Sequence, residues 1–235
     1  MTINVYWSCI EKEWMRATEP EPVSPLFYKS HLFNKNDTGL DMNKCPSFND
    51  NLKNVFALRS IYSYELNVDH NGVLSTSYGQ DFFDEHVTVK SLDKRLISFR
   101  QSYTFLTDEK SLKVTLSEPP FLEDNQLTRD LLIIPGVIDI GKWYRNTDTM
   151  FYMKDGVSSF KINEGDIYGY VRFHTDEDIN FIQYRHTDTL NKYMMDSVYS
   201  KENKKLTYSL TKYYSMFKSK NLVLEEIKKN ILGEQ

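Results

Sequence analysis

The sequence predicts a mainly β protein of the α+β class, with an antiparallel β core, an N-terminal extended arm and C-terminal helices. The composition favours sheet, because 16 Tyr and 14 Phe stand against only 9 Gly, and aromatic residues suit half-buried pleated surfaces. Runs that alternate apolar and polar residues fill the middle of the chain between turn signals. Helical periodicity is confined to a short stretch before that middle part and a longer one after it.

The length indicates one domain spanning residues 1–235, since 235 residues can bury a substantial core. Within it we expect an extended arm over 1–40, a barrel-like β core over 60–185 and a helical segment over 188–232. The arm and the helices should cover the strand edges of the core, because uncovered edges promote aggregation.

Closely spaced prolines define the expected arm. Pro20, Pro22 and Pro25 favour extended backbone and oppose a helix. The aromatic residues Trp7 and Trp14 would then pack onto the body of the protein. A proline motif that binds a partner is the alternative, if the arm is exposed.

One short helix is predicted before the core. Within 42–59, apolar residues at helical spacing form a single stripe made of Phe48, Leu52, Val55 and Phe56. Pro46 or Ser47 would stand near the start of this helix.

Hairpins should follow this helix. Residues 60–68 alternate as a strand, and Asn71-Gly72 after them is typical of a hairpin turn. Two more strand-like runs between 96 and 116 predict a second hairpin around 107–110.

A pair of glycine-containing turns is the most informative feature of the chain. An apolar strand over 131–134 runs into Gly136-Val137-Ile138-Asp139, which we expect to form a turn. A strand over 158–162 then precedes a second turn at Gly165-Asp166 and a third strand. Glycine at such positions favours a positive φ, and the acidic residue accepts hydrogen bonds from neighbouring amides.

The C-terminal part changes to helical spacing. One group of apolar residues runs over 206–217, and a second consists of Leu222, Leu224, Ile227 and Ile231. About two helices are therefore expected after the core.

Charge and cysteine content exclude some classes of protein. A net charge of −4 argues against wholesale coating of nucleic acid. Cys9 and Cys45 are the two cysteines, which fits a reducing compartment better than a disulfide scaffold. The N-terminus lacks the features of a signal peptide, and no apolar run is long enough for a membrane span. We therefore expect a soluble protein of the cytoplasm, without a membrane partner.

Neither a metal site nor a catalytic motif is recognisable. The five histidines show no short ligand spacing, and we interpret them as structural or surface residues. The two cysteines have no local base, and the glycine-rich phosphate loops and the GxSxG elbow are absent. Carboxylate clusters, as at 81–85 and 176–178, fit solvated turns better than a cation site. We predict no cofactor, no metal and no catalytic residue.

The best candidate for binding a ligand follows the first glycine turn. Its residues are Asp139, Lys142, Trp143, Tyr144 and Arg145. Aromatic rings can stack on a base, and Lys or Arg can hold a phosphate. The alternative is that the two aromatic residues cover a sheet edge while the two cations are solvated.

Both turns resemble motifs of dUTPase-like proteins. Gly136-Val137-Ile138-Asp139 and Asn163-Glu164-Gly165-Asp166-Ile167 match that family in order and approximate spacing. The resemblance implies a dUTPase-like β-clip core, and it assigns to Asp139 a part in holding deoxyribose. The chain departs from the family elsewhere: Lys142 stands where the stacking tyrosine would be, and Tyr144 is displaced by two positions. The acidic metal motif, the Arg-Ser-Gly phosphate loop and the glycine-rich lid are missing.

A second resemblance covers more of the chain. The segments 44–48, 134–145 and 165–173 are similar to a group of uncharacterised tailed-bacteriophage proteins, of T4-like and marine phages. It implies a viral accessory protein that works in a bacterial host, in the cytoplasm or in the virion.

Three functions remain open on this basis. The first is a non-catalytic phage protein that binds a host or phage macromolecule. The second is a protein that binds or processes nucleotides on a dUTPase-like core, and the third is a structural component of the virion. The dUTPase-like resemblance also suggests a homo-oligomer.

Overall fold

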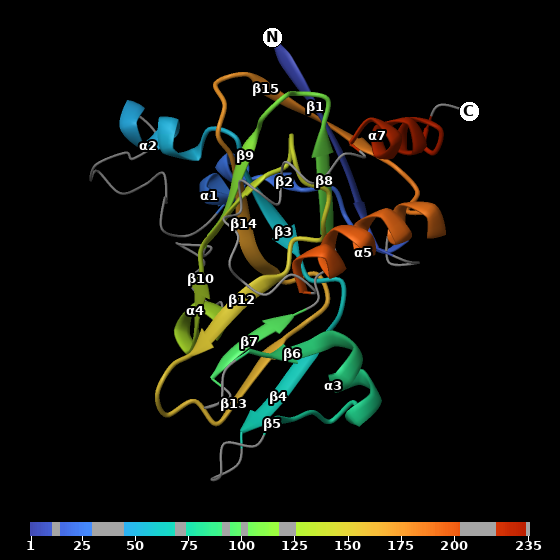
Figure 1. Ribbon diagram of the computed structural model, residues 1–235. Helices are drawn as coiled ribbons and strands as arrows, with labels where there is room; N and C mark the ends of the chain where they lie inside the picture. Colours follow the sequence, from blue (N-terminus) through green and yellow to red (C-terminus); the bar gives the residue numbers. More distant parts are fainter. Residues whose placement is uncertain are drawn as a thin grey trace.

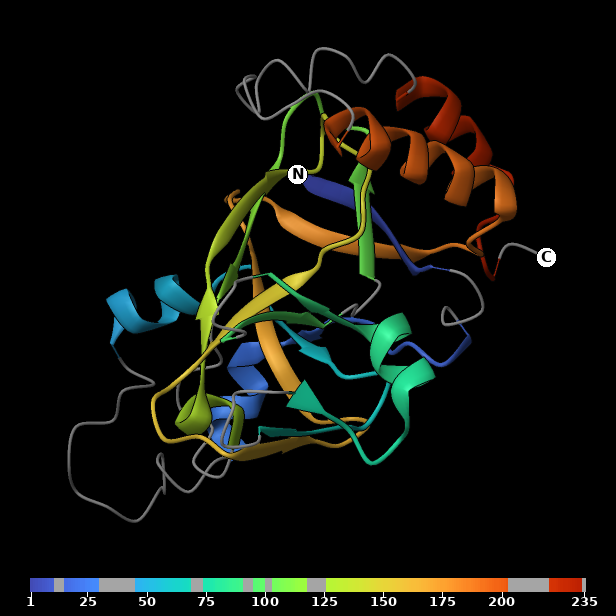
Figure 2. The ribbon, with the colours of Figure 1, turned by 60° about the horizontal axis from the view of Figure 1, so that its bottom comes forward.

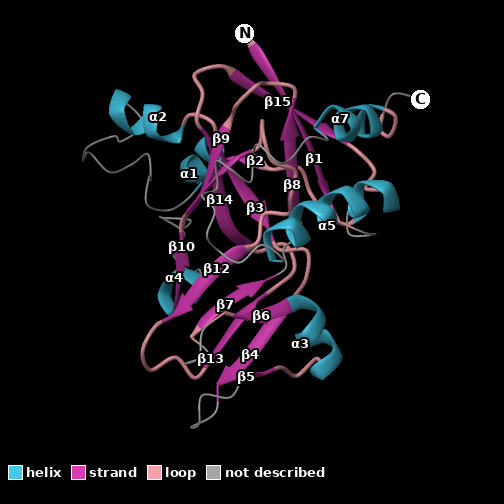
Figure 3. Cartoon of the chain, in the orientation of Figure 1, coloured by secondary structure: helices cyan, strands magenta, loops and turns pink. Residues whose placement is uncertain are grey.

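The structure of the protein, a computed structural model, describes residues 1–10, 15–29, 45–68, 74–90, 95–99, 103–117, 126–202 and 220–233. Within these residues, strands in four sheets form most of the regular structure (Figures 1 and 3). The strand pairs are antiparallel except for β1 with β15. The mainly β, antiparallel fold expected from the sequence is confirmed.

The N-terminal strand lies at the centre of a sheet. β1 (Thr2–Cys9) pairs in parallel with β15 (Asp178–Gln183) and antiparallel with β8 (Tyr103–Thr107). Its second half is buried on both faces, so it shows none of the alternation by which half-exposed strands are recognised. Residues Val5 to Cys9 are therefore part of the core, and this differs from the extended arm expected over 1–40.

The largest sheet has five strands and contains both conspicuous glycine segments. In spatial order the strands are β11 (Gly136–Asp139), β9 (Lys113–Ser117), β14 (Ile167–Phe173), β3 (Val55–Arg59) and β2 (Glu21–Pro22). Gly136 to Asp139 thus form an edge strand, where a turn was expected, and Gly136 has no positive φ. Gly165 does turn the chain with φ of 86°, as predicted, and Asp166 accepts a hydrogen bond from the Asn163 amide at 2.8 Å.

Two further sheets complete the β part. One has the order β10 (Leu131–Ile134), β12 (Thr149–Met153), β7 (Leu96–Phe99) and β6 (Val87–Val89). The other consists of β13 (Ser159–Ile162), β4 (Tyr64–Val68) and β5 (Leu74–Ser75). Each of the four sheets is open among the described strands, and no barrel closes there. The prediction of a barrel-like core is wrong in this respect.

The expected hairpins are realised in part. β4 and β5 pair as predicted, and the residues that join them, including Asn71-Gly72, lie outside the described part of the chain. β8 and β9 do flank residues 108–112, but they belong to different sheets. The prediction of a second hairpin is therefore wrong. The reason is that β1 supplies the partner of β8, while β9 pairs with β11 and β14.

Four short helices lie between the strands along the chain. They are α1 (Val23–Lys29), α2 (Pro46–Leu52), α3 (Gln80–His86) and α4 (Gln126–Asp130). α1 begins where prolines were expected to exclude a helix, because Pro25 lies in its first turn, where a missing N–H breaks no helical hydrogen bond.

The helix predicted within 42–59 is shorter than its apolar stripe. α2 ends at Leu52, and Asn54 adopts a positive φ of 54°. Asn54 also donates from its side chain to the carbonyls of Thr175 and Glu177, which holds this reversal in place. Val55 and Phe56 consequently lie on β3, where pairing with β14 outweighs the local helical spacing.

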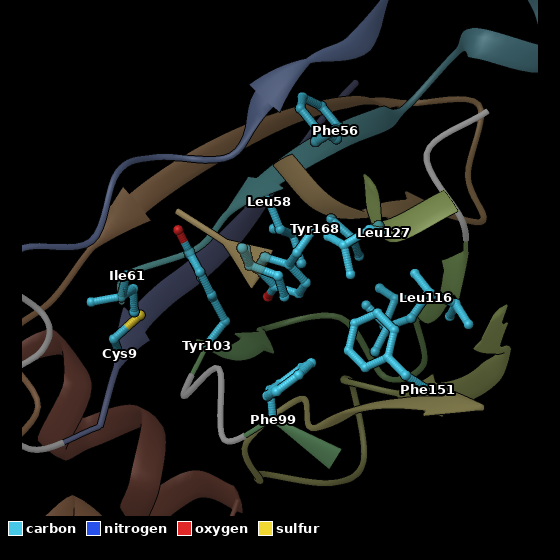
Figure 4. Packing of buried hydrophobic residues seen from close by; sticks show 14 of the residues in the cluster. Cys9, Phe56, Leu58, Ile61, Phe99, Tyr103, Leu116, Leu127, Phe151 and Tyr168 are labelled. Carbon is cyan, nitrogen blue, oxygen red and sulfur yellow. The ribbon is translucent and has the colours of Figure 1, made fainter. Parts of the chain in front are cut away.

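Aromatic and aliphatic side chains from several sheets form the main core (Figure 4). Phe99 lies with its ring centroid 4.6 Å from that of Tyr64 and 5.1 Å from that of Phe151. Such pairs add about 0.5–1.5 kcal/mol each beyond the burial of their surface. Part of the high Tyr and Phe content of the sequence is thus used in this core.

Two helices cover the sheet that contains β1 (Figure 2). They are α5 (Asp188–Glu202) and α7 (Lys220–Lys228), and they form a second core cluster with Tyr6 and Leu106. α7 buries Val223, Leu224 and Ile227, whereas Leu222 of the predicted stripe is 53% exposed. The helical group expected over 206–217 lies outside the described residues. No described helix has the length and apolar character that a membrane span requires.

Candidate functional site

Asp139 ends strand β11 and is the centre of the turn in which we predicted a ligand site. Its carboxylate accepts hydrogen bonds from the Ser111 hydroxyl at 2.6 Å and from the Leu112 and Gly141 amides at 3.1 Å. The Lys142 ammonium lies 2.8 Å away. Asp139 thereby joins the turn to the start of β9, and it is only 3% exposed.

These contacts also determine the charge of Asp139. Burial by itself would raise the pKa of this carboxyl group, but the hydrogen bonds from Lys142 and Ser111 outweigh burial and lower the pKa below its usual value. Asp139 is therefore an ionised, buried acceptor whose donors belong to the chain itself. The expectation that it bonds to neighbouring amides is confirmed.

Gly141 allows this close approach of two backbone segments. A Cβ at this position would lie 2.7 Å from Cα of Ser111 and 2.8 Å from the Glu109 carbonyl oxygen. Since both atoms belong to the main chain, no side-chain rotation could relieve the overlap. A glycine is thus required here by packing, without any positive φ.

The two aromatic residues of the predicted site point into the protein. Trp143 is 4% exposed, and the Arg145 guanidinium lies over its ring, 4.7 Å from the centroid. Tyr144 is fully buried, and its hydroxyl lies 3.1 Å from that of Tyr184 and 3.3 Å from Nδ1 of His186. Burial raises the pKa of Tyr144, which keeps this phenol neutral.

The two cations of the site are closer to solvent. The Lys142 side chain is 43% exposed although it pairs with Asp139. Arg145 donates from Nε to the Asn146 carbonyl at 2.9 Å and approaches Asp148. The five predicted residues thus divide into an ion pair between a buried carboxylate and a partly exposed lysine, a cation over a ring and a core tyrosine. Binding of a ligand to them stays a prediction.

A buried polar network lies beside this turn, and sequence reasoning did not identify it. The Tyr184 hydroxyl links that of Tyr144 to Oγ1 of Thr104, at 3.1 and 2.7 Å. Burial lowers the pKa of His186, at the end of the network, to about 4. Its members come from distant parts of the chain, so no local spacing indicated them. Among the described residues, no group of three metal-ligating side chains comes together.

An apolar surface on the four-stranded sheet is the other candidate. Leu132 and Ile134 of β10 point away from the core and are each 40% exposed. They lie opposite Tyr152 and Met150 of β12, which are half-buried. Because paired residues of antiparallel strands share one side of the sheet, these four side chains form a single patch, the β10 face. Val137 of β11, which belongs to another sheet, is 54% exposed.

A signal for the β10 face is present in the sequence. The run Leu131-Leu132-Ile133-Ile134 is apolar at every position, whereas a strand with one solvated face alternates. Leu131 and Ile133 point into the core, and the other two do not. The continuous apolar run therefore leaves two large apolar side chains exposed on the outer side of β10.

In comparisons with known proteins, the fold of this chain is distantly similar to a few solved structures. No protein-family model matches the chain, and neither does any curated protein. Among solved structures, a mutant dUTPase of Staphylococcus bacteriophage 80alpha with dUpNHpp is 11% identical, with a TM-score of 0.37 over 78% of this chain and 89% of that one. Two structures of the dUTPase from phage phi11 of S. aureus are 12% and 11% identical, each with a TM-score of 0.35. They cover 78% and 79% of this chain and 98% of theirs. The phage dUTPases are thus neighbours in shape, and nothing about activity follows from a likeness at this distance.

Proposed function

We propose that this protein acts by binding another protein, of phage or host origin, through the β10 face, as a non-catalytic phage accessory protein. One observation carries the proposal: four apolar side chains lie together on the outside of a sheet, in a chain of which 26% is charged. Contiguous exposed apolar patches on soluble proteins commonly mark sites of interaction.

The energetics of the patch support this function. Leu132 and Ile134 are packed on one side only, and burying the exposed remainder of such side chains contributes about 25 cal/mol per Å² of apolar surface. The neighbouring Tyr152 and Met150 suit interfaces, because tyrosine offers a rigid ring and methionine adapts to irregular shapes. The patch would thus be the centre of a larger interface with a polar rim.

The environment of Asp139 also favours protein binding, as the main role, over the binding or processing of a nucleotide. The carboxylate that the dUTPase resemblance assigns to deoxyribose already accepts three hydrogen bonds and an ion pair from the chain. A sugar hydroxyl would have to displace one of these donors.

The test is an affinity capture from phage-infected bacteria that compares matched variants. The variant Leu132→Lys/Ile134→Lys introduces two charges on the β10 face, and Leu222→Lys introduces one at an exposed leucine of α7. A protein captured by the unmodified chain and by Leu222→Lys, but lost from the face variant, supports the proposal. Capture that is equal for all three, or no capture, contradicts it.

A nucleotide is the second candidate ligand, and one observation favours it. The Lys142 side chain is 43% exposed, and its ammonium lies 3.3 Å from the Ser111 hydroxyl, so both could contact a phosphate. A thermal-shift panel of nucleotides, with and without Mg²⁺, tests this candidate. Stabilisation that is lost in Lys142→Ala supports it, and the absence of any shift rules it out.

A structural role in the virion is the third candidate. Mass spectrometry of purified particles would detect the protein if it is packaged, and its absence from particles would exclude this role.

A further inference from the structure

We propose that a buried water molecule bridges the hydroxyls of Tyr168 and Thr149 and thereby links two sheets of the core. Tyr168 lies on β14 of the five-stranded sheet, and Thr149 is the first residue of β12 in the four-stranded sheet. Neither residue belongs to the β10 face or to the turn that follows Asp139, so this site is separate from both candidates described above.

A β-bulge directs Tyr168 into the main core. The register of β14 with β3 shifts between Ile167 and Gly169, which leaves Tyr168 as an extra residue on its strand. Since side chains alternate along a regular strand, Tyr168 would otherwise share a face with Tyr170. Tyr170 lies in a separate cluster with residues of α1 and α2, whereas Tyr168 (Figure 4) joins the main core together with Val171. The bulge thus places a phenol among mostly apolar side chains.

Two buried hydroxyls meet at this place, and neither has a hydrogen-bond partner among the described residues. Tyr168 is fully buried, and Thr149 is 2% exposed. Within the described part of the chain, Oη of Tyr168 and Oγ1 of Thr149 form no hydrogen bond, either with other groups or with each other. Burial raises the pKa of Tyr168 well above its usual value, and Thr149 opposes this shift, which indicates that the two groups are close. Tyr168 is therefore a neutral phenol beside a second hydroxyl.

One water molecule satisfies both hydroxyls. Buried polar groups of folded proteins are nearly always hydrogen-bonded, either to the chain or to ordered water, because an unsatisfied hydroxyl costs free energy. A water molecule donates and accepts at once, so it can join two hydroxyls whose separation or direction does not allow a direct bond. Proteins hold on the order of one buried water per 27 residues, usually at polar groups that have no other partner.

A neighbouring tyrosine offers a matched control. Besides burial, the charge of Tyr103 raises the pKa of Tyr168, so the two phenols lie near each other in the core. The Tyr103 hydroxyl, however, donates to the carbonyl of Thr18 at 3.0 Å. Its loss breaks a direct hydrogen bond within the chain and should leave the water in place.

The bridge adds a polar link between two sheets. β12 and β14 do not pair with each other, and their inward side chains share the main core. Packing of apolar side chains is not directional, whereas a hydrogen-bonded bridge fixes the positions of the groups that it joins. The water therefore helps to define how the four-stranded sheet, which carries the β10 face, lies on the five-stranded sheet.

A double-mutant cycle tests the link between the two hydroxyls. Tyr168→Phe and Thr149→Val each remove one hydroxyl and keep the shape of the side chain. Urea unfolding then gives the stability of both variants and of their combination. We expect each single substitution to lower the ratio of folded to unfolded chain about five-fold. The combination should cost less than the two effects together, because the first substitution already breaks the bridge. Circular dichroism checks that each variant folds.

A second measurement detects the water itself. Magnetic relaxation dispersion of oxygen-17 in solution counts the water molecules that stay inside a protein for long times. The count should fall by one in the combined variant Tyr168→Phe/Thr149→Val and should be unchanged in Tyr103→Phe. Coupling in the cycle together with the loss of one water supports the inference.

The other outcomes overturn the inference. Additive effects of the two substitutions show that the hydroxyls share no bridge, and a gain of stability in either single variant shows that its hydroxyl was unsatisfied. Coupling without a change in the water count shows a direct hydrogen bond between the two side chains. Because neither residue lies on the β10 face, each of these results leaves the capture experiment of the proposed function unaffected.

Discussion

Gly141→Ala should destabilise the protein strongly, although it adds only one methyl group. The new Cβ would lie 2.7 Å from Cα of Ser111 and 2.8 Å from the Ser111 nitrogen and the Glu109 carbonyl oxygen. To relieve this overlap, the turn after β11 must move away from the start of β9. That movement stretches the hydrogen bonds from Ser111 and Leu112 to Asp139.

The magnitude follows from these two effects. Forcing extra volume into a packed site costs about 1–3 kcal/mol, and a weakened hydrogen bond to a charged group costs up to about 1.5–3 kcal/mol. We expect the free energy of unfolding to fall by about 3 kcal/mol. For a chain of this size the melting temperature should then fall by about 6–12 °C.

Gly136→Ala is the matched control in the same segment. A Cβ at Gly136 meets no atom within 4 Å, and the residue has no positive φ. The control should change the free energy of unfolding by less than about 1 kcal/mol, with stabilisation the expected direction. Urea unfolding followed by tryptophan fluorescence and circular dichroism compares the two variants. If Gly141→Ala is as stable as the unmodified chain, or if both variants lose the same stability, the reasoning about close backbone contact is refuted.

Three further predictions concern buried polar groups. The folded-state pKa of Asp139 is lowered below its unfolded value of about 3.9, so its stabilisation is complete above about pH 4 and is lost as the pH falls through the folded-state pKa. In Asp139→Asn the free energy of unfolding, measured with urea from about pH 6 to 3, should fall less as the pH is lowered. An equal fall in the variant and the unmodified chain would contradict this prediction. His186 has a pKa lowered to about 4, below its unfolded value near 6.5, so stability should rise with pH between these values. In His186→Gln the free energy of unfolding should rise less with pH over this range. An equal slope in the variant and the unmodified chain would contradict this prediction. Tyr184→Phe removes the middle hydroxyl of the buried network and should cost about 1–3 kcal/mol in the same assay, while Tyr78→Phe at an exposed tyrosine should be neutral. Equal effects of the two would show that the network contributes nothing.

The candidate site was predictable only in its local part. The acidic residue after an apolar strand indicated hydrogen bonds to neighbouring amides, and Asp139 makes them. The inward direction of Trp143 and Tyr144 was not predictable, because it depends on Arg145 over one ring and on Tyr184 beside the other. Spacing along a chain does not say which face of a turn the rest of the protein will cover.

The sequence by itself determined the class of this fold. Its abundant Tyr and Phe, its alternating runs and its late helical spacing indicate a β core with helices after it, since these patterns depend on neighbours a few residues apart. Only the tertiary structure decided that β1 lies in the centre of a sheet, that β8 and β9 part into different sheets, and that Val55 and Phe56 form a strand. It also decided that the segment from Gly136 to Asp139 is an edge strand, beside a β10 whose outer side chains remain exposed. Strand pairing is a contact between distant residues, and its energy can outweigh local preference. Which apolar residues are buried and which remain exposed is therefore settled only when the sheets are assembled.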